Sequence, residues 1–237
     1  MKSVKFRMIA IALLSATMPF TAKAQDKVEA SVSADFVSNY IWRGTDCGGV
    51  SIQPSMGVSY KGLSLTAWGS VGIDKEDARE IDLTLGYNTG GFSVSVTDYW
   101  FSYRKEDGGY TGDYFKYGAH STVHIFEATL GYDFGPLALS WNTYFAGDDY
   151  TKENGDRAYS TYVGISAPFK LGGLDWSAEV GLTPWEGAYA NKFNVTNLTL
   201  KAEKEIKFTN SFSLPTFAQV TFNPHTQGAY FVFGVSF

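Results

Sequence analysis

Large apolar residues alternate with small or polar residues along most of this chain. Leu63 and Leu65 flank Ser64, and residues 174–183 and 229–237 follow the same period of two. Because a β-strand points successive side chains to opposite faces, each of these segments has one apolar face and one polar face. The pattern predicts many short strands rather than a helical bundle.

Very short turns join many of these segments in pairs. Gly-containing turns lie near residues 60–63, 88–92 and 133–137, and longer polar connections separate the pairs. An aromatic residue, a glycine turn and a new apolar segment together are typical of a β-hairpin. The twelve expected strands are 28–44, 50–60, 63–72, 80–88, 92–103, 122–133, 137–146, 158–168, 174–183, 193–204, 211–222 and 228–237.

An even number of strands, with short turns at one end and long loops at the other, is the plan of a transmembrane β-barrel. Strands of about ten residues are long enough to cross a bilayer at a tilt. A soluble β-sandwich or lipocalin-like barrel also alternates. Such a protein covers itself with charge, whereas only 18% of these residues are charged and 16% are aromatic. We therefore predict an all-β fold, a transmembrane antiparallel up-and-down barrel of about 12 strands.

The first residues have the pattern of an export signal. Basic residues precede an apolar run at 8–20, and an Ala-Lys-Ala stretch follows it. This pattern predicts a signal peptide at 1–24 and a mature barrel at 25–237. Removing its four basic residues leaves 15 basic against 24 acidic residues, a formal charge of −9. Nucleic acid is a poor partner for such a chain, and the single Cys47 allows no intramolecular disulfide.

The C-terminal segment ends on an aromatic residue, Phe237, after apolar residues at alternate positions. Its alternate side chains would face lipid, and pairing of the last strand with the first would close the barrel. The segment also resembles the C-terminal signal of bacterial outer-membrane proteins. We expect the bacterial outer membrane as the location, both termini on the periplasmic side, and outer-membrane lipid and the barrel assembly machinery as partners.

A second resemblance lies near the mature N-terminus. The strand at 33–44 ends in Tyr40-Ile-Trp-Arg-Gly44, and a short polar link leads to a strand containing Gln53. Over about residues 35–60 this arrangement resembles the TorF-type porin family. The chain departs from the family pattern at Asp46 and the cysteine after it, and its first outer loop looks short. The resemblance implies a pore in the outer membrane and no particular ligand.

The polar faces of the predicted strands carry ionisable residues that would point into the barrel. Buried unpaired charges are costly, so we expect these groups to be hydrated, paired with one another, or both. Twelve strands fall between filled eight-stranded barrels and open channels of 16–18 strands. The expected pore is therefore narrow or partly occluded. The predicted pore-lining residues are Asp35, Arg43, Asp82, Glu127, Asp175, Glu179, Lys201 and Glu203, with Glu29 and Asp133 near strand ends.

Arg43 stands out among these charges, because a guanidinium can hold carboxylates in a fixed geometry. Asp35 and Glu127 are its candidate partners. Carboxylates outnumber cations in the inward set, and a narrow channel lined by one sign of charge concentrates counter-ions. The excess of inward carboxylates therefore predicts that the pore mildly prefers cations.

The most direct hypothesis for function is passive diffusion of small polar solutes through this pore, without enzymatic activity or a cofactor. An outer-membrane lipid hydrolase is an alternative, and it requires one of His120, His124 or His225 beside a serine. A non-conducting structural or adhesive barrel is another. No pair of histidines is accompanied by further zinc ligands, so we expect no zinc site. The acidic loop at 147–156 lacks the spacing of a calcium loop.

The longest predicted connection, 104–121, carries four aromatic residues among charges and glycines. A freely solvated loop needs no such content. We expect this loop to fold over or into the mouth of the barrel and to narrow it.

Overall fold

The computed structural model describes residues 27–105, 109–119, 121–209 and 212–237, so the predicted signal peptide lies outside the described residues. In these ranges no helix is long and apolar enough to span a membrane. The strands are β1 (Glu29–Val37), β2 (Tyr40–Trp42), β3 (Thr45–Gly48), β4 (Ser51–Tyr60), β5 (Leu63–Gly72), β6 (Arg79–Thr89), β7 (Phe92–Ser102), β8 (His124–Asp133), β9 (Ala138–Gly147), β10 (Thr161–Leu171), β11 (Leu174–Thr183), β12 (Asn194–Lys207), β13 (Ser213–Asn223) and β14 (Gly228–Ser236).

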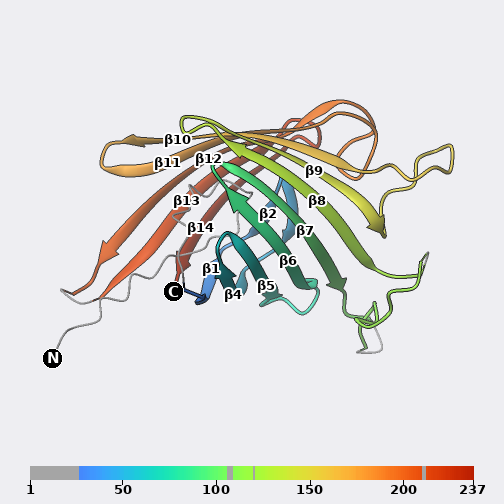
Figure 1. Ribbon diagram of the computed structural model, residues 1–237, viewed down its shortest axis with the longest axis horizontal. Coiled ribbons are helices and arrows are strands. Elements are labelled where there is room, and N and C mark those ends of the chain that lie inside the picture. The colour runs from blue at the N-terminus through green and yellow to red at the C-terminus, as the bar shows by residue number, and fades with distance from the viewer. Residues whose placement is uncertain (1–26, 106–108, 120, 210–211) are drawn as a thin grey trace.

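Twelve of these strands form one closed barrel (Figure 1). β4 to β14 pair each with the next, and β1 pairs with both β4 and β14, always antiparallel. Closure leaves no free edge strand at the ends of the sheet order. The predicted fold class and the number of barrel strands are confirmed. β2 and β3 form a separate two-stranded sheet.

The short turns follow from local sequence. β6 and β7 pair without a break from Arg79–Ser102 to Thr89–Phe92, and Gly90 and Gly91 alone connect them. Both glycines have positive φ, +55° and +86°, as a tight two-residue hairpin turn requires. A Cβ on Gly91 would lie 2.7 Å from the Asp133 carbonyl oxygen, so this turn also needs glycine for space.

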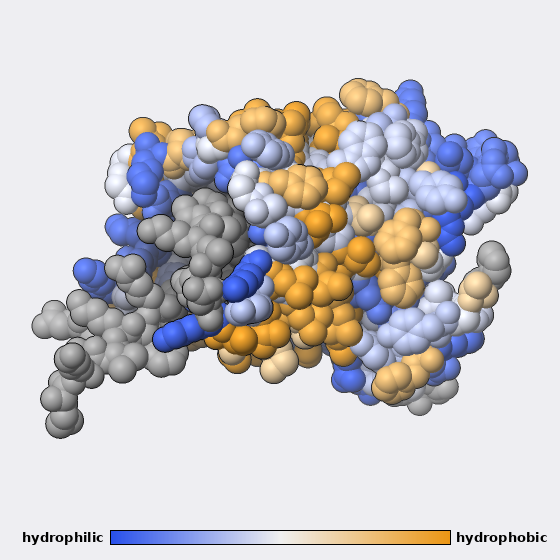
Figure 2. Space-filling view, in the orientation of Figure 1, coloured by the Kyte–Doolittle hydropathy of each residue, from blue (hydrophilic) through white to orange (hydrophobic). Residues whose placement is uncertain are grey.

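The barrel is apolar outside and polar inside. Val32 and Phe231, for example, are 79% and 69% exposed, whereas most buried side chains are polar. Figure 2 shows an apolar band around the middle of the barrel between hydrophilic ends. This distribution follows directly from the period of two, because every strand turns its apolar residues to the same side of the sheet.

The two ends of the barrel differ. The connections 103–123 and 147–161 extend from the end at the right of Figure 1, which we call the long-loop end. At the opposite, short-turn end, Glu29 pairs with Ser59 beside the β4–β5 turn, and Phe237 exchanges backbone hydrogen bonds with Ala34. Both the first described strand residue and the C-terminus therefore lie at the short-turn end.

The first predicted strand, 28–44, is wrong in its extent. β1 ends at Val37, and residues 40–48 form the β2–β3 hairpin inside the barrel. Strict alternation fails at the polar pair Ser38-Asn39 and at the apolar run 40–42, and the bend lies in this irregular stretch. The first outer connection is therefore an inward-folded element rather than a short link.

The expectation that residues 104–121 enter the mouth is also wrong for their described part. Tyr114 and Tyr117 pack against His124, whose side chain lies on the outward face of β8 next to Phe126. Tyr117 also contacts Phe126, which in turn meets the exposed Phe145. The aromatic residues of this loop cover the outer wall because His124 and its neighbours offer a ring-lined surface there.

Candidate functional site

The β2–β3 hairpin turns at Arg43 and Gly44, which have φ of +50° and +80°. These values are those of a two-residue type I′ turn, whose twist matches its strands. The tip lies against β12: a Cβ on Gly44 would lie 1.9 Å from the Thr196 carbonyl oxygen. The Asn223 amide donates to the Gly44 carbonyl oxygen at 3.0 Å. The hairpin thus crosses the barrel interior at the long-loop half.

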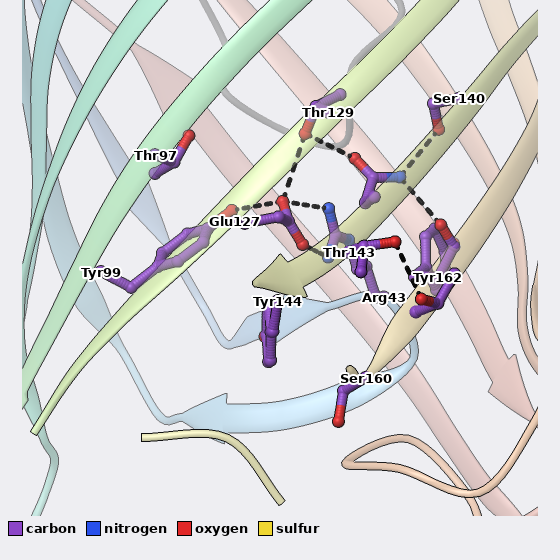
Figure 3. Close-up of polar contacts among 12 residues, drawn as sticks. Arg43, Thr97, Tyr99, Glu127, Thr129, Ser140, Thr143, Tyr144, Ser160 and Tyr162 are labelled. Atoms are coloured by element: carbon purple, nitrogen blue, oxygen red, sulfur yellow. Dashed lines mark hydrogen bonds and ion pairs between the residues drawn. The ribbon is translucent and has the colours of Figure 1, made fainter. Parts of the chain in front are cut away.

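Arg43 forms a two-point ion pair with Glu127 of β8 (Figure 3). Its Nη1 donates to Oε2 at 2.5 Å and its Nη2 to Oε1 at 2.9 Å. The Tyr99 hydroxyl donates to the same Oε1 at 2.9 Å. Both ends of the pair are almost fully buried. Burial of two charges is tolerable here because each charge is met by its counterpart and by further hydrogen bonds.

Aromatic rings enclose the Arg43 guanidinium. Its Cζ lies 4.2 Å from the centre of the Trp42 ring and 4.8 Å from that of Tyr162, close enough for cation–π attraction. Nη1 also donates to the Tyr189 hydroxyl at 2.6 Å, which in turn donates to the Tyr144 hydroxyl at 3.2 Å. Burial raises the pKa of Tyr189 to about 12, so this hydroxyl remains neutral and can pass the hydrogen bond on.

A second polar cluster continues the network along the wall. The Tyr162 hydroxyl donates to Glu179 Oε1 at 2.5 Å. The Asn197 amide donates to the same carboxylate oxygen at 3.1 Å and to the Tyr162 hydroxyl at 3.0 Å. Thr199 donates to the Asn197 side-chain oxygen at 2.8 Å. The hairpin tip is therefore seated on fixed polar groups from β8 to β12.

The opposite side of the hairpin is apolar. Ile41 of β2 packs with Val37, Phe217 and Val232, all buried. A small void lies beside this cluster, bounded also by Gln53 and Gln219. The interior is closed at this level by the hairpin and its contacts, while the amide side chains keep part of the lining polar.

A pair of acidic residues lies on the inward face of β6. Glu80 is 4% exposed, and Tyr40 of the hairpin packs on Trp68 of the neighbouring strand β5 with ring centres 5.5 Å apart. The hairpin therefore contacts the β5–β6 wall as well as Glu127. Asp82 is among the predicted pore-lining residues and Glu80 is not, although both have the same parity on one strand. The tyrosines around Arg43 were not predicted either, because their contacts come from distant strands.

The remaining predicted residues lie on the inward side of their strands. Lys201 pairs with Glu203 and lies 4.4 Å from the centre of the Phe217 ring. Asp175 pairs with Lys170 at the short-turn end. Of the two candidate partners for Arg43, Glu127 forms the ion pair with it, while Asp35 lies at the β1–β14 seam opposite Ser236. The strand-end residues predicted to face inward are Glu29 and Asp133, which begin β1 and end β8.

The histidines do not form a hydrolase site in the described part of the chain. His124 is fully buried, with Nδ1 2.7 Å from Asp98 Oδ1 and Nε2 2.7 Å from the Tyr114 carbonyl oxygen. His225 contacts Asn194, and His120 lies outside the described residues. Neither described histidine bonds a serine hydroxyl, and the described residues hold no group of three potential metal ligands.

No protein-family model and no curated protein sequence matches this chain. Among solved structures it is similar to the crystal structure of BamA from Haemophilus ducreyi lacking POTRA domains 1–3. The TM-score is 0.38 and the identity 12%, over 81% of this chain. The chain spans only 41% of that BamA chain. A likeness of this degree says nothing about function.

Proposed function

We propose that this protein is an outer-membrane channel for passive diffusion of small polar solutes, without catalytic activity, in which the β2–β3 hairpin forms the constriction. The carrying observation is the inside-out barrel, with exposed apolar side chains outside and polar groups inside. An apolar band between polar ends fits a bilayer. The likeness of the C-terminal segment to outer-membrane signals and of residues 35–60 to TorF-type porins supports the same location.

The two halves of the interior support a channel rather than a filled barrel. At the level of the hairpin, inward residues such as Glu127 and Asn142 are buried. Towards the short-turn end, the inward residues are small and polar, and they are partly exposed to water: Ser31, Ser33, Ser59, Ser64, Thr66, Ser93, Ser95, Ser140 and Ser177. Solutes entering from the short-turn end would therefore meet a hydrated wall and then the hairpin.

The β2–β3 hairpin occupies the interior in the long-loop half of the barrel, and this favours a second candidate, a non-conducting structural or adhesive barrel. In this second candidate the Arg43–Glu127 ion pair holds the hairpin in the lumen permanently, and the hairpin fills the lumen. The two candidates differ for the native chain: a channel conducts, whereas a permanently filled barrel conducts only when the hairpin is removed.

The test is conductance of the purified protein in planar bilayers, compared with a variant in which a short Gly/Ser turn replaces residues 38–50. We expect small conductance from the native chain and several-fold larger conductance from the variant. A matched control replaces residues 109–119 of the outer-wall loop and should conduct like the native chain. Absence of conductance in both the native chain and the hairpin variant would refute the channel.

A further inference from the structure

The seam between β1 and β14 is the shortest in the barrel. It has three register pairs, from Asp35–Ser236 to Val37–Gly234, extended by backbone bonds at Ala34–Phe237 and Ser38–Phe233. Every other pair of neighbouring barrel strands has at least six register pairs, as β9 and β10 do. Among the described residues, 228–232 of β14 have no paired strand on the β1 side, where β2 touches β14 only through side chains such as Ile41 on Val232.

The hydrogen-bonding pattern shows which backbone groups are unpaired at the edge of residues 228–232, which we call the gap. Ala34 and Phe237 exchange two bonds, at 3.2 and 2.9 Å, so Phe237 directs both of its polar groups towards β1. Every second residue does the same in an antiparallel ladder. Phe231 and Ala229 therefore direct their N–H and C=O groups into the gap. Unpaired backbone groups at membrane depth are costly.

The β2–β3 hairpin has the length and register to fill this gap. The β1–β4 ladder pairs Val37 with Ser51, and the hairpin pair Tyr40–Gly48 continues the same register. The hairpin is thus the distal end of the β1–β4 ladder, bent inward. Continuing the β1–β14 register in the same way puts Tyr40 opposite Phe231, and Trp42 opposite Ala229.

We infer that the β2–β3 hairpin has two positions. In one it occupies the barrel interior, as described above. In the other it straightens, residues 39–43 pair with residues 228–232 of β14, and the interior is free. The occupant of the open β14 edge is therefore the chain's own first outer connection. The movement is independent of the proposed function, whereas its effect on conductance rests on it.

Each position has its own set of contacts. The interior position gains the Arg43–Glu127 ion pair and the ring contacts around it. The straight position pairs the polar backbone groups of Phe231 and Ala229. It also turns Tyr40 and Trp42 outward beside Phe231, which is 69% exposed, and aromatic side chains suit the membrane interface.

The bend has a suitable construction for this change. Gly48 and Gly49 lie at the return from the hairpin to β4, and neither has a side chain to resist rotation. The Gly49 N–H donates to Asp77 Oδ1 at 3.3 Å. The Ile73 N–H of the same β5–β6 connection donates to the Val50 carbonyl oxygen at 2.8 Å. These two contacts hold the return segment in its bent course.

The test uses a disulfide that only the straight position allows. In a Cys47→Ser background, which removes the only thiol, Trp42→Cys is combined with Ala229→Cys. In the interior position Trp42 packs on Tyr99 of β7, across the barrel from β14. Under mild oxidation we expect the disulfide to form in membranes. The matched control, Trp42→Cys with Tyr230→Cys, should not cross-link, because a shift of one residue points the second sulfur to the other face.

The conductance of the cross-linked protein separates this inference from the proposed function. We expect a several-fold rise that a reducing agent reverses. Formation of the disulfide without a rise would leave the movement standing and overturn the channel. A native chain that conducts, while the double variant at positions 42 and 229 never cross-links, would overturn the two-position hairpin and leave the channel standing.

Discussion

Arg43 is held from several sides at the tip of a tight turn. Glu127 takes two of its hydrogen bonds, Tyr189 accepts another, and the Trp42 ring lies 4.2 Å from its Cζ. A lysine could supply the charge but not the planar fork that meets both carboxylate oxygens. The residue type at this position therefore sets both where the hairpin tip rests and how firmly.

Arg43→Ala should release the hairpin, because it leaves Glu127 buried without its counter-charge. Losing one partner of a buried pair costs about 3 kcal/mol, roughly a hundredfold in the ratio of the two hairpin positions. Single-channel recording should show longer open times, with Arg43→Lys intermediate. Arg157→Ala removes an arginine that bonds only the Gly147 carbonyl in the described contacts, and it should leave open times unchanged. Unchanged open times in Arg43→Ala would show that the Arg43–Glu127 ion pair does not hold the hairpin inside the barrel.

Gly44→Ala should displace the hairpin without changing any charge. Its Cβ would lie 1.9 Å from the Thr196 carbonyl oxygen, which belongs to the wall and cannot move aside. Gly155→Ala is the matched control, because Gly155 has a similar φ of +87° and nothing within 4 Å of its added Cβ. We expect Gly44→Ala alone to raise the conductance. Equal behaviour of the two variants would attribute the effect to backbone strain rather than to contact with the wall.

At the scale of elements, the described residues 109–119 of the β7–β8 connection pack on the outer wall of the barrel. The His124 ring bonds Asp98 and the Tyr114 carbonyl, and Tyr117 covers it with ring centres 4.2 Å apart. Asp98 is on the outward face, where an uncovered carboxylate would meet lipid in the proposed location. The loop and His124 together shield it.

His124→Ala should therefore lower stability and leave conductance unchanged. The substitution leaves a carboxylate and a carbonyl without their donors, which costs about 2 kcal/mol. Thermal unfolding monitored by circular dichroism should show the loss, and limited proteolysis should cut within 109–119 more readily. His225→Ala, which loses a single contact with Asn194, is the control. A changed conductance in His124→Ala would place the loop in the solute path after all.

At the scale of the whole molecule, inward acids exceed inward bases. Arg43, Lys170 and Lys201 each pair with a carboxylate. In the described part of the chain, no ion pair involves the inward residues Glu80 and Asp82. Ionised carboxylates in this excess would give the interior a negative field, which the proposed narrow passage would focus on passing ions.

A salt gradient across a planar bilayer should give a reversal potential of cation-selective sign. The double variant Glu80→Gln with Asp82→Asn should reduce this potential, because it removes the inward charge that lacks a basic partner. Glu76→Gln, at an exposed position of the β5–β6 connection, should have no effect. High salt should weaken the selectivity through screening. Anion preference of the native protein would overturn the expectation.

The barrel, its strand number and the inward side of each strand could be predicted because they follow from a local rule. A period of two fixes which side chains share a face, and short glycine turns fix which strands are neighbours. Glu127 was named as a partner for Arg43 on parity and charge alone. Asp35 was an equal candidate on those grounds, since the spatial separation of strands is absent from the pattern.

The bend after Val37, the aromatic enclosure of Arg43 and the course of the 103–123 loop were decided only by the tertiary structure. Residues 38–44 break the alternation at Ser38-Asn39 and at 40–42, which marks an irregular stretch but does not fix the direction in which the chain turns. The direction depends on Glu127, Tyr189 and Thr196, which lie far along the chain. Such contacts exist only after the barrel has closed and brought β8 and β12 to the tip of one hairpin.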